Sequence, residues 1–269
     1  GLRNLPIDGH VPLSMRARDV APQVQSLEHL RNYEMDCVND PEIWLAARQQ
    51  QLANTANEPG NVLRTRLHEL QRLTAISNED PEVCAGLTKA LKATVTVPTL
   101  RMNSMDLHIP FIRAGFEQAM QLIPASVQQE WEAARTALLA SKEPVDTTFA
   151  EWSLRRTGNL QSAGVPIAAG TDTPIGWSIS GYSLHTELEQ YVEVGMTPVE
   201  ALRSATVAPA EYFGLEDEMG QLKVGFIADA VLLTGNPLEN IIDTRRVQAV
   251  INRGALLTRA QLDGLITDR

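Results

Sequence analysis

Cysteine, basic charge and long apolar runs are all scarce in this sequence of 269 residues. Its two cysteines, Cys37 and Cys84, stand alone in helix-like stretches and match neither a zinc pattern nor a disulfide framework, so we expect two buried thiols. No apolar run approaches the roughly 18 residues of a membrane span. The 33 acidic residues outnumber the 23 basic ones, giving a formal charge of −10. That balance argues against a nucleic-acid surface and against binding to an anionic membrane.

The beginning of the chain also lacks a signal-peptide pattern, because Gly1 to Asn4 lead directly into a strand-like segment. With no initiator methionine and a strand at its start, the chain is expected to lack its natural N-terminus. A signal peptide would then lie in the missing segment, so the sequence predicts no compartment.

What is present is a series of strand-like segments that alternate with helical ones. Hydrophobic residues make up 43% of the sequence, as in ordinary globular proteins. The expected strands are 3–11, 26–30, 94–98 and 165–170. The expected helices are 14–23, 40–76 with a break at 58–60, 80–92, 111–141, 146–163, 183–195, 197–206 and 208–214. This alternation predicts a parallel sheet in an α/β fold.

The C-terminal part of the sequence changes character. Short strand-like runs at 220–225, 230–233 and 247–252 are broken by Gly, Asn and Pro, which predicts a small β module. A complete (β/α)₈ barrel needs eight strands and about 250 residues. We therefore expect about half of a TIM-type barrel over residues 1–215 and an appended β-sandwich segment over 216–269.

Three residues that can bind a metal lie at the C-terminal ends of expected strands: His10, His29 and Asp172. The carboxyl ends of barrel strands are where active sites are built. Imidazole and carboxylate are ligands that a zinc-type ion accepts. A lone histidine at such a position is more often structural, so the spacing alone leaves both a metal site and a structural role open.

A longer pattern in the second half resembles the amidohydrolase superfamily. The pattern comprises the motifs AAGTDTP (168–174), LHTELE (184–189), GMTPVEAL (195–202), AT (205–206), APA (208–210), GQLKVG (220–225), ADAVLL (228–233), NPL (236–238) and 247–254. It is similar to the branch that contains imidazolonepropionase and the Xaa-Pro dipeptidase-like enzymes. The resemblance is strong over 164–257, moderate over 5–30 and 94–100, and weak over 40–92 and 101–160.

The resemblance implies specific roles for the three candidates. His10 and His29 would be the metal ligands after strands 5 and 6 of the barrel, and Asp172 would be the strand 8 carboxylate, which both binds metal and moves protons. The implied cofactor is zinc, as one or two ions in a full-length enzyme. The implied reaction is hydrolysis of a small cyclic amide or dipeptide-like amide by a metal-activated hydroxide.

The sequence departs from the family pattern in its metal ligands. The strand 1 His-x-His pair is missing, since the histidines are at 10, 29, 68, 108 and 185. A bridging lysine just upstream of His10 is missing as well. An alternative is therefore an inactive fragment whose open sheet edge needs a homo-oligomer or a missing N-terminal segment to cover it. A non-enzymatic binding protein built on half a barrel is a third hypothesis.

Three further residues are candidates for substrate binding. His185 follows strand 8 in the family's helix motif, and either touches substrate, supports Asp172 or caps a helix. Trp177 and Tyr182 lie in the preceding loop, where aromatic side chains either line a pocket or simply pack. His108 lies in a loop after strand 7, where family members often place substrate contacts, but a solvated loop residue is the simpler interpretation. Asp229 is expected to make a turn or to pack the β module.

Overall fold

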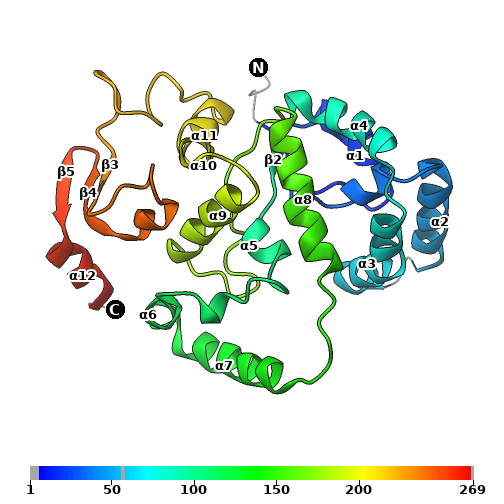
Figure 1. Cartoon of the computed structure of the whole chain (residues 1–269), viewed down its shortest axis with the longest axis horizontal. Coiled ribbons are helices and arrows are strands. Elements are labelled where there is room, and N and C mark those ends of the chain that lie inside the picture. The colour runs from blue at the N-terminus through cyan, green and yellow to red at the C-terminus, as the bar shows by residue number, and fades with distance from the viewer. Residues whose placement is uncertain (1–5, 56–57, 268–269) are drawn as a thin grey trace. The chain divides into compact units, whose positions relative to one another are not determined.

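The computed structural model describes residues 6–55 and 58–267, which form two compact units (Figure 1). Each unit is built from two stretches of the chain. The first comprises Gly1–Thr99 and Asp146–Ala168, and the second comprises Leu100–Val145 and Ala169–Arg269.

A short parallel sheet lies in the first unit. Strand β1 (Ser26–Glu28) pairs in parallel with β2 (Val95–Val97), so that Leu27 is opposite Thr96. On its other side β2 forms a single parallel bridge from Thr96 to Ile167. Two of the expected strands and their parallel direction are thus confirmed, whereas the expected strand 165–170 is reduced to one bridge.

The expected strand at 3–11 is not formed within its described part, residues 6–11. The carbonyls of Ile7 and Gly9 accept the N–H groups of Gln25 and Glu28, at 2.8 and 3.0 Å. Pro6 has no N–H to donate, so a regular ladder cannot begin there. Residues 3–5 of this expected strand lie outside the described residues.

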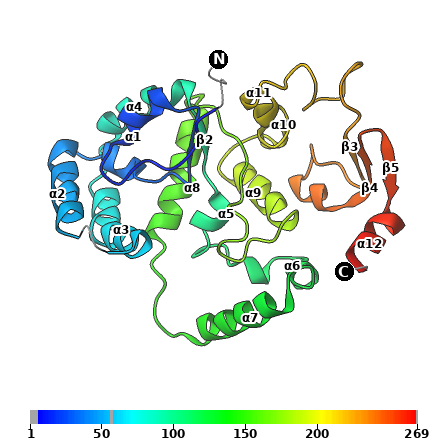
Figure 2. The ribbon, with the colours of Figure 1, turned by 180° about the vertical axis from the view of Figure 1, so that it is seen from behind.

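Helices surround this sheet in the first unit, which Figure 2 shows from behind. They are α1 (Ala17–Val20), η1 (Ala21–Gln23), η2 (Tyr33–Asp36), α2 (Pro41–Asn54), α3 (Gly60–Ser77), α4 (Pro81–Ala90), η3 (Leu91–Ala93) and α8 (Thr148–Ser162). Asp80 caps α4 by accepting the N–H groups of Glu82 and Val83, as the Asp-Pro start signal predicts. Leu27, Leu87, Trp152 and other fully buried side chains form the core beneath them.

The second unit is mainly helical, with α9 (Tyr182–Glu193) packing against three other elements: α5 (Leu100–Asn103), α10 (Pro198–Ser204) and η5 (Ile241–Arg245). Its other helices are η4 (Pro110–Ile112), α6 (Phe116–Met120), α7 (Ala125–Ala140), α11 (Val207–Tyr212) and α12 (Arg259–Thr267). The expected capping box at the start of α10 is confirmed, because Thr197 and Glu200 bond reciprocally.

An antiparallel sheet closes the C-terminal part of the second unit. Its strands β3 (Ala230–Leu233), β4 (Val247–Asn252) and β5 (Ala255–Thr258) are adjacent in that order. The first two were expected, but residues 220–225 form no strand. Gly220 and Gly225 have φ values of +88° and +91°, which interrupt an extended backbone there. In the described part of the chain, no helix is both long and apolar enough to span a membrane.

Candidate active site

Two of the three expected metal ligands come together in the first unit. The rings of His10 and His29 lie with their centroids 4.9 Å apart and their planes inclined by 58°. His10 is exposed, whereas His29 is 8% exposed. Imidazole nitrogens are among the ligands that a zinc-type ion accepts.

The position of His29 is fixed by the end of the parallel sheet. Its N–H donates to the carbonyl of Val97, at 2.8 Å, and its Nδ1 is hydrogen-bonded to Oγ1 of Thr99, also at 2.8 Å. His29 and Thr99 both have left-handed backbone, with φ of +63° and +54°. When a histidine binds a metal through one ring nitrogen, a hydrogen bond to the other ring nitrogen typically orients the ring, and the bond from Thr99 to Nδ1 could do this for His29.

The third expected ligand, Asp172, lies in the second unit, in a loop that Arg101 holds. The Arg101 guanidinium donates from Nε to the carbonyl of Thr171 (2.8 Å), from Nη2 to Ile175 (2.6 Å) and from Nη1 to Gly176 (2.6 Å). Asp172 also has left-handed backbone, with φ of +51°. Burial lowers the pKa of Arg101 to about 10, so the guanidinium remains protonated at neutral pH. A single cation therefore fixes both sides of the loop that carries the carboxylate.

Arg101 is itself held by a buried carboxylate. The two oxygens of Glu187 accept the backbone N–H groups of Leu100 (2.8 Å) and Arg101 (2.7 Å). Glu187 is completely buried, and this burial raises its pKa to about 7, while the two N–H groups and the Arg101 charge act in the opposite direction. Glu187, Arg101 and the Asp172 loop thus form one connected polar group.

Removal of the Arg101 guanidinium should weaken the second unit. Arg101→Met retains the length of the side chain but leaves three carbonyls without their donor, so the free energy of unfolding should fall by about 3 kcal/mol. Urea denaturation measures this change. Arg203→Met, at an exposed position of α10, should shift it by less than about 0.5 kcal/mol. Equal effects of the two substitutions would contradict the role of Arg101.

Glu187 should make the stability depend on pH. Its pKa rises from 4.5 to about 7 in the folded chain, so between these values the native state holds a proton that the unfolded chain has lost. The free energy of unfolding should therefore fall as pH rises through this window, by on the order of 3 kcal/mol. Glu187→Gln should flatten the slope, and Glu211→Gln, at an exposed site, should retain it. An unchanged slope in Glu187→Gln would refute this assignment.

The expected substrate-binding residues all lie in the second unit. His185 is hydrogen-bonded through Nδ1 to Thr244 Oγ1 at 2.9 Å, and burial, followed by the charge of Arg245, lowers its pKa. Trp177 packs edge-on against Phe111, with ring centroids 5.7 Å apart. These contacts join His185 to η5 and Trp177 to an aromatic cluster.

Tyr182 belongs to the same aromatic cluster. Its ring lies 6.0 Å from that of Phe116 and 4.6 Å from the Arg245 guanidinium, and its hydroxyl donates to the carbonyl of Ala114. A substrate-binding role for His185, Trp177 and Tyr182 remains a prediction.

A protein-family model matches the chain from residue 89 to residue 257. The model is described as "Amidohydrolase family", and the match covers more than half of the sequence. The chain belongs to the amidohydrolase family. The family predicted from the GTD motif and the segments that follow it is thereby confirmed. His10 and His29 lie outside the matched residues.

Individual relatives match about a third of this amidohydrolase chain. The ochratoxinase of Aspergillus niger is 44% identical over 81 residues, which cover 29% of this chain and 16% of the ochratoxinase. The imidazolonepropionase of Aeromonas hydrophila subsp. hydrophila is 34% identical over 91 residues, 33% of this chain and 22% of that protein. Both matches are far shorter than the relatives themselves.

A solved structure, a bottromycin amidohydrolase, shares the fold of the amidohydrolase chain. It superposes with a TM-score of 0.64 at 19% sequence identity, over 97% of this chain and 52% of the solved one. The mixed α/β fold is thus confirmed as that of an amidohydrolase. The chain spans about half the length of this solved relative.

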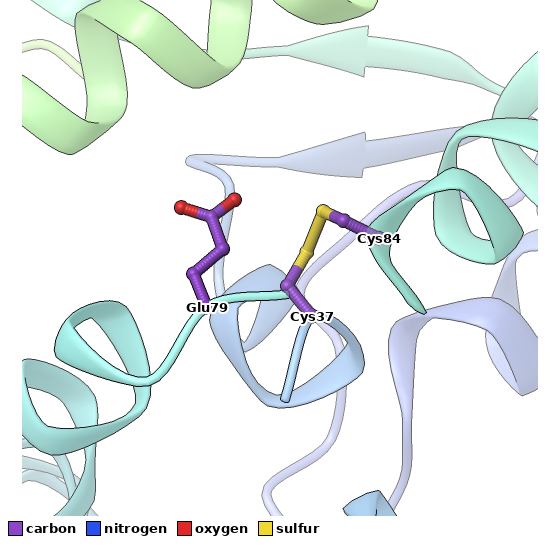
Figure 3. Close-up of side chains that lie close together, drawn as sticks. All are labelled: Cys37, Glu79 and Cys84. Carbon is purple, nitrogen blue, oxygen red and sulfur yellow. A yellow bond between two sulfur atoms is a disulfide. The ribbon is translucent and has the colours of Figure 1, made fainter. Parts of the chain in front are cut away.

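The cysteines of the amidohydrolase chain depart from the expectation of two free thiols. Cys37 and Cys84 are buried, as expected, but they form a disulfide across 47 residues of sequence. The packing of η2 against α4 and the bridge between Val38 and Glu79 bring the two cysteines together, and the sequence contains no short-range signal for this approach. Glu79 lies beside the sulfur atoms (Figure 3).

Sequence reasoning also missed Arg101 and Glu187 as parts of the candidate active site. Glu187 stands in the quoted LHTELE motif, and a charged residue on the buried face of an expected helix was the available signal. Arg101 carries no such signal, because its three carbonyl partners lie at least 70 residues away along the sequence.

Proposed function

We propose that this protein is a metal-dependent hydrolase of C–N bonds in small amides, either a cyclic amide or a dipeptide-like substrate. Its membership of the amidohydrolase family supports the reaction class. Its likeness to an ochratoxinase and to an imidazolonepropionase supports a small-molecule amide as the substrate. The observation that carries the proposal is the close pair of His10 and His29 beside the parallel sheet.

The donor set fits a zinc-type ion. His10 and His29 offer neutral nitrogen ligands, and the bond from Thr99 to the ring of His29 is the kind of support that such ligands receive. A metal ion bound there would lower the pKa of a water molecule and polarise the amide carbonyl. Zinc is proposed because two imidazoles and a carboxylate suit it.

Asp172 is proposed as the residue that moves protons. A carboxylate at that position would accept a proton from the attacking water and deliver it to the departing nitrogen, which avoids the release of an amide anion. The three hydrogen bonds from Arg101 hold the loop that carries Asp172. The carboxylate is therefore already positioned before the substrate binds, and no entropy is lost in ordering it during the reaction.

The remaining metal ligands are proposed to come from outside the printed sequence. The chain spans 52% of the bottromycin amidohydrolase structure, and its sequence contains neither a His-x-His pair nor a lysine upstream of His10. We propose that residues 1–215 form the C-terminal half of a barrel and that 216–269 form its appended β-sandwich segment. A longer protein would supply these ligands, whereas a second copy of the chain could only cover the open sheet edge.

Zinc binding by the chain itself tests this proposal. Equilibrium dialysis under oxidising conditions, which keep the disulfide closed, should show zinc bound to the wild type. His10→Ala and His29→Ala should each weaken binding by about 10–100-fold or more. His108→Ala, which removes a partner of Glu193 in the second unit, is the matched control and should bind zinc as the wild type does. Zinc binding that is equal in all four proteins would sink the proposal.

A further inference from the structure

A second cluster of potential metal ligands lies in the first unit, apart from the histidine pair. One ligand atom from each of Cys37, Glu79 and Cys84 can be chosen so that all three lie within 4.8 Å of one another. The two sulfurs are joined as a disulfide in this structure, so they cannot bind a metal in this state. The carboxylate of Glu79 points into the space beside them (Figure 3).

Backbone hydrogen bonds hold the three residues together independently of the disulfide. The N–H of Asp80 donates to the carbonyl of Cys37 at 2.7 Å, and the N–H of Cys84 donates to the carbonyl of Asp80 at 2.9 Å. Glu79 forms an antiparallel bridge with Val38. Breaking the S–S bond therefore leaves the two sulfurs as near neighbours beside the same carboxylate.

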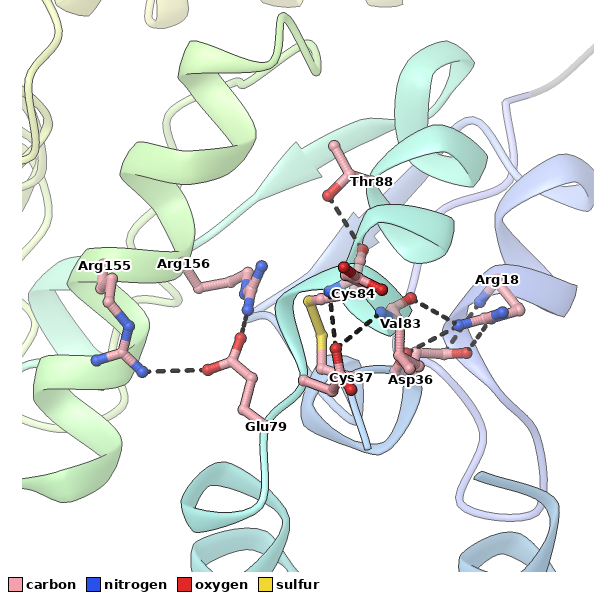
Figure 4. The surroundings of a disulfide bond; sticks show 11 residues. Arg18, Asp36, Cys37, Glu79, Val83, Cys84, Thr88, Arg155 and Arg156 are labelled. Carbon is pink, nitrogen blue, oxygen red and sulfur yellow. Dashed lines mark hydrogen bonds and ion pairs between the residues drawn. A yellow bond between two sulfur atoms is a disulfide. The ribbon is translucent and has the colours of Figure 1, made fainter. Parts of the chain in front are cut away.

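A groove gives access to this cluster from solvent. Cys84 and Glu79 line the groove together with Thr88, Arg155 and Arg156. Cys84 lines this groove and Cys37 does not, so an external thiol would approach the disulfide from the side of Cys84, which is 2% exposed. Figure 4 shows Arg155 and Arg156, both on α8, paired with the carboxylate of Glu79 near the disulfide.

Each of the two arginines pairs with one carboxylate oxygen of Glu79, so one of these pairs must open before Glu79 can bind a metal. Arg156, which is 5% exposed, contacts Oε1 of Glu79, and Arg155 contacts Oε2 at 3.1 Å. The Arg155 side chain is 53% exposed, so it can turn into solvent and release Oε2 at little cost. Arg156 would then remain on Oε1 and orient the carboxylate, as outer partners of metal-bound carboxylates do.

We propose that reduction converts the Cys37–Cys84 disulfide into a binding site for a thiophilic divalent cation, completed by Glu79. The reductant is a dithiol. One of its thiolates attacks Cys84 Sγ, so the Cys37–Cys84 bond breaks and Cys37 leaves as a thiolate. The second thiolate of the reductant then attacks the mixed disulfide, which frees Cys84 and leaves the reductant as an oxidised cyclic disulfide.

The reduced cluster has the composition of a thiolate-rich metal site. Two thiolates and one carboxylate suit Zn²⁺ or Cd²⁺, and the groove leaves a fourth position for water. Cation binding would release the protons of the two thiols, because the thiolate is the form that binds the metal. The oxidised and reduced forms of the chain would thus differ in metal capacity.

Cadmium alone is a suitable probe, because its thiolate complexes absorb in the ultraviolet. The wild-type chain, reduced with a dithiol that is then removed under anaerobic conditions, should bind one Cd²⁺ more than the oxidised chain and develop a thiolate-to-cadmium charge-transfer band. Both forms share the histidine pair, so the difference between them reports on the cysteine cluster. No difference in bound cadmium would overturn the proposal.

Variants separate the contributions of the three ligands. Cys84→Ser should abolish the band, and Glu79→Gln should weaken cadmium affinity about 10-fold or more while both thiols remain. Glu82→Gln, an exposed acidic residue in the first turn of α4, is the matched control and should bind as the wild type does. If Glu79→Gln bound cadmium with wild-type affinity, Glu79 would not be a ligand and the proposed three-residue site would be wrong. Loss of cooperative thermal unfolding on reduction would also overturn the proposal, since the cluster needs the folded backbone.

Discussion

Asp172→Asn is expected to lower kcat/KM for amide hydrolysis by about 10²- to 10⁴-fold in the complete protein, which is the usual contribution of a positioned acid–base group. Asparagine has nearly the same shape and retains the loop that Arg101 holds, but it cannot accept a proton from water. Steady-state kinetics with a proline-containing dipeptide and with a cyclic amide measure the loss.

The matched control for this substitution is Asp229→Asn. Asp229 Oδ1 accepts the N–H of Arg253 at 2.6 Å, in the turn between β4 and β5, as its expected turn role requires. This change should affect stability and leave kcat/KM within about twofold of wild type. Wild-type rates in Asp172→Asn, with unaltered unfolding, would exclude Asp172 from the chemistry.

The second large effect is expected from the disulfide. The bond closes a loop with a sequence separation of 47 residues, and the chain-entropy relation gives about 4 kcal/mol of stabilisation for a loop of that size. The double variant Cys37→Ala/Cys84→Ala should therefore unfold at a lower urea concentration than the oxidised wild type.

Reduced wild type provides the control for the disulfide prediction. It retains both sulfur atoms in the core and should approach the double variant in its free energy of unfolding, because both lack the covalent link. A loss of this size still leaves a domain of ordinary stability folded. Identical urea midpoints for oxidised and reduced wild type would contradict a stabilising disulfide.

Local patterns predicted the elements that local chemistry determines. The β-branched run at 94–98 predicted β2, and the Asp80-Pro81 signal predicted the start of α4. The strand expected at 165–170 is only a single bridge at Ile167. A longer ladder needs a neighbouring strand beside it, and the composition of a segment does not show where such a strand lies. The strand β5 and helix α12 were not expected at all.

Patterns in the sequence identified residues of the candidate site at expected strand ends, and not where distant segments meet. His10 and His29 were chosen in this way, and their rings are close, although the strand expected before His10 is not formed in residues 6–11. The clamp of Arg101 and the buried carboxylate of Glu187 join segments separated by 86 residues. The Cys37–Cys84 bond likewise depends on a tertiary approach, so the expectation of two thiols was wrong.

The left-handed backbone at Thr99 has a consequence for the evolution of this protein. A β-branched residue at φ of +54° is strained, and glycine or asparagine would adopt that conformation more easily. Neither replacement offers the hydroxyl that holds the ring of His29. Selection for stability alone would therefore favour glycine or asparagine at position 99, and either substitution would remove the hydroxyl that orients the ring of His29.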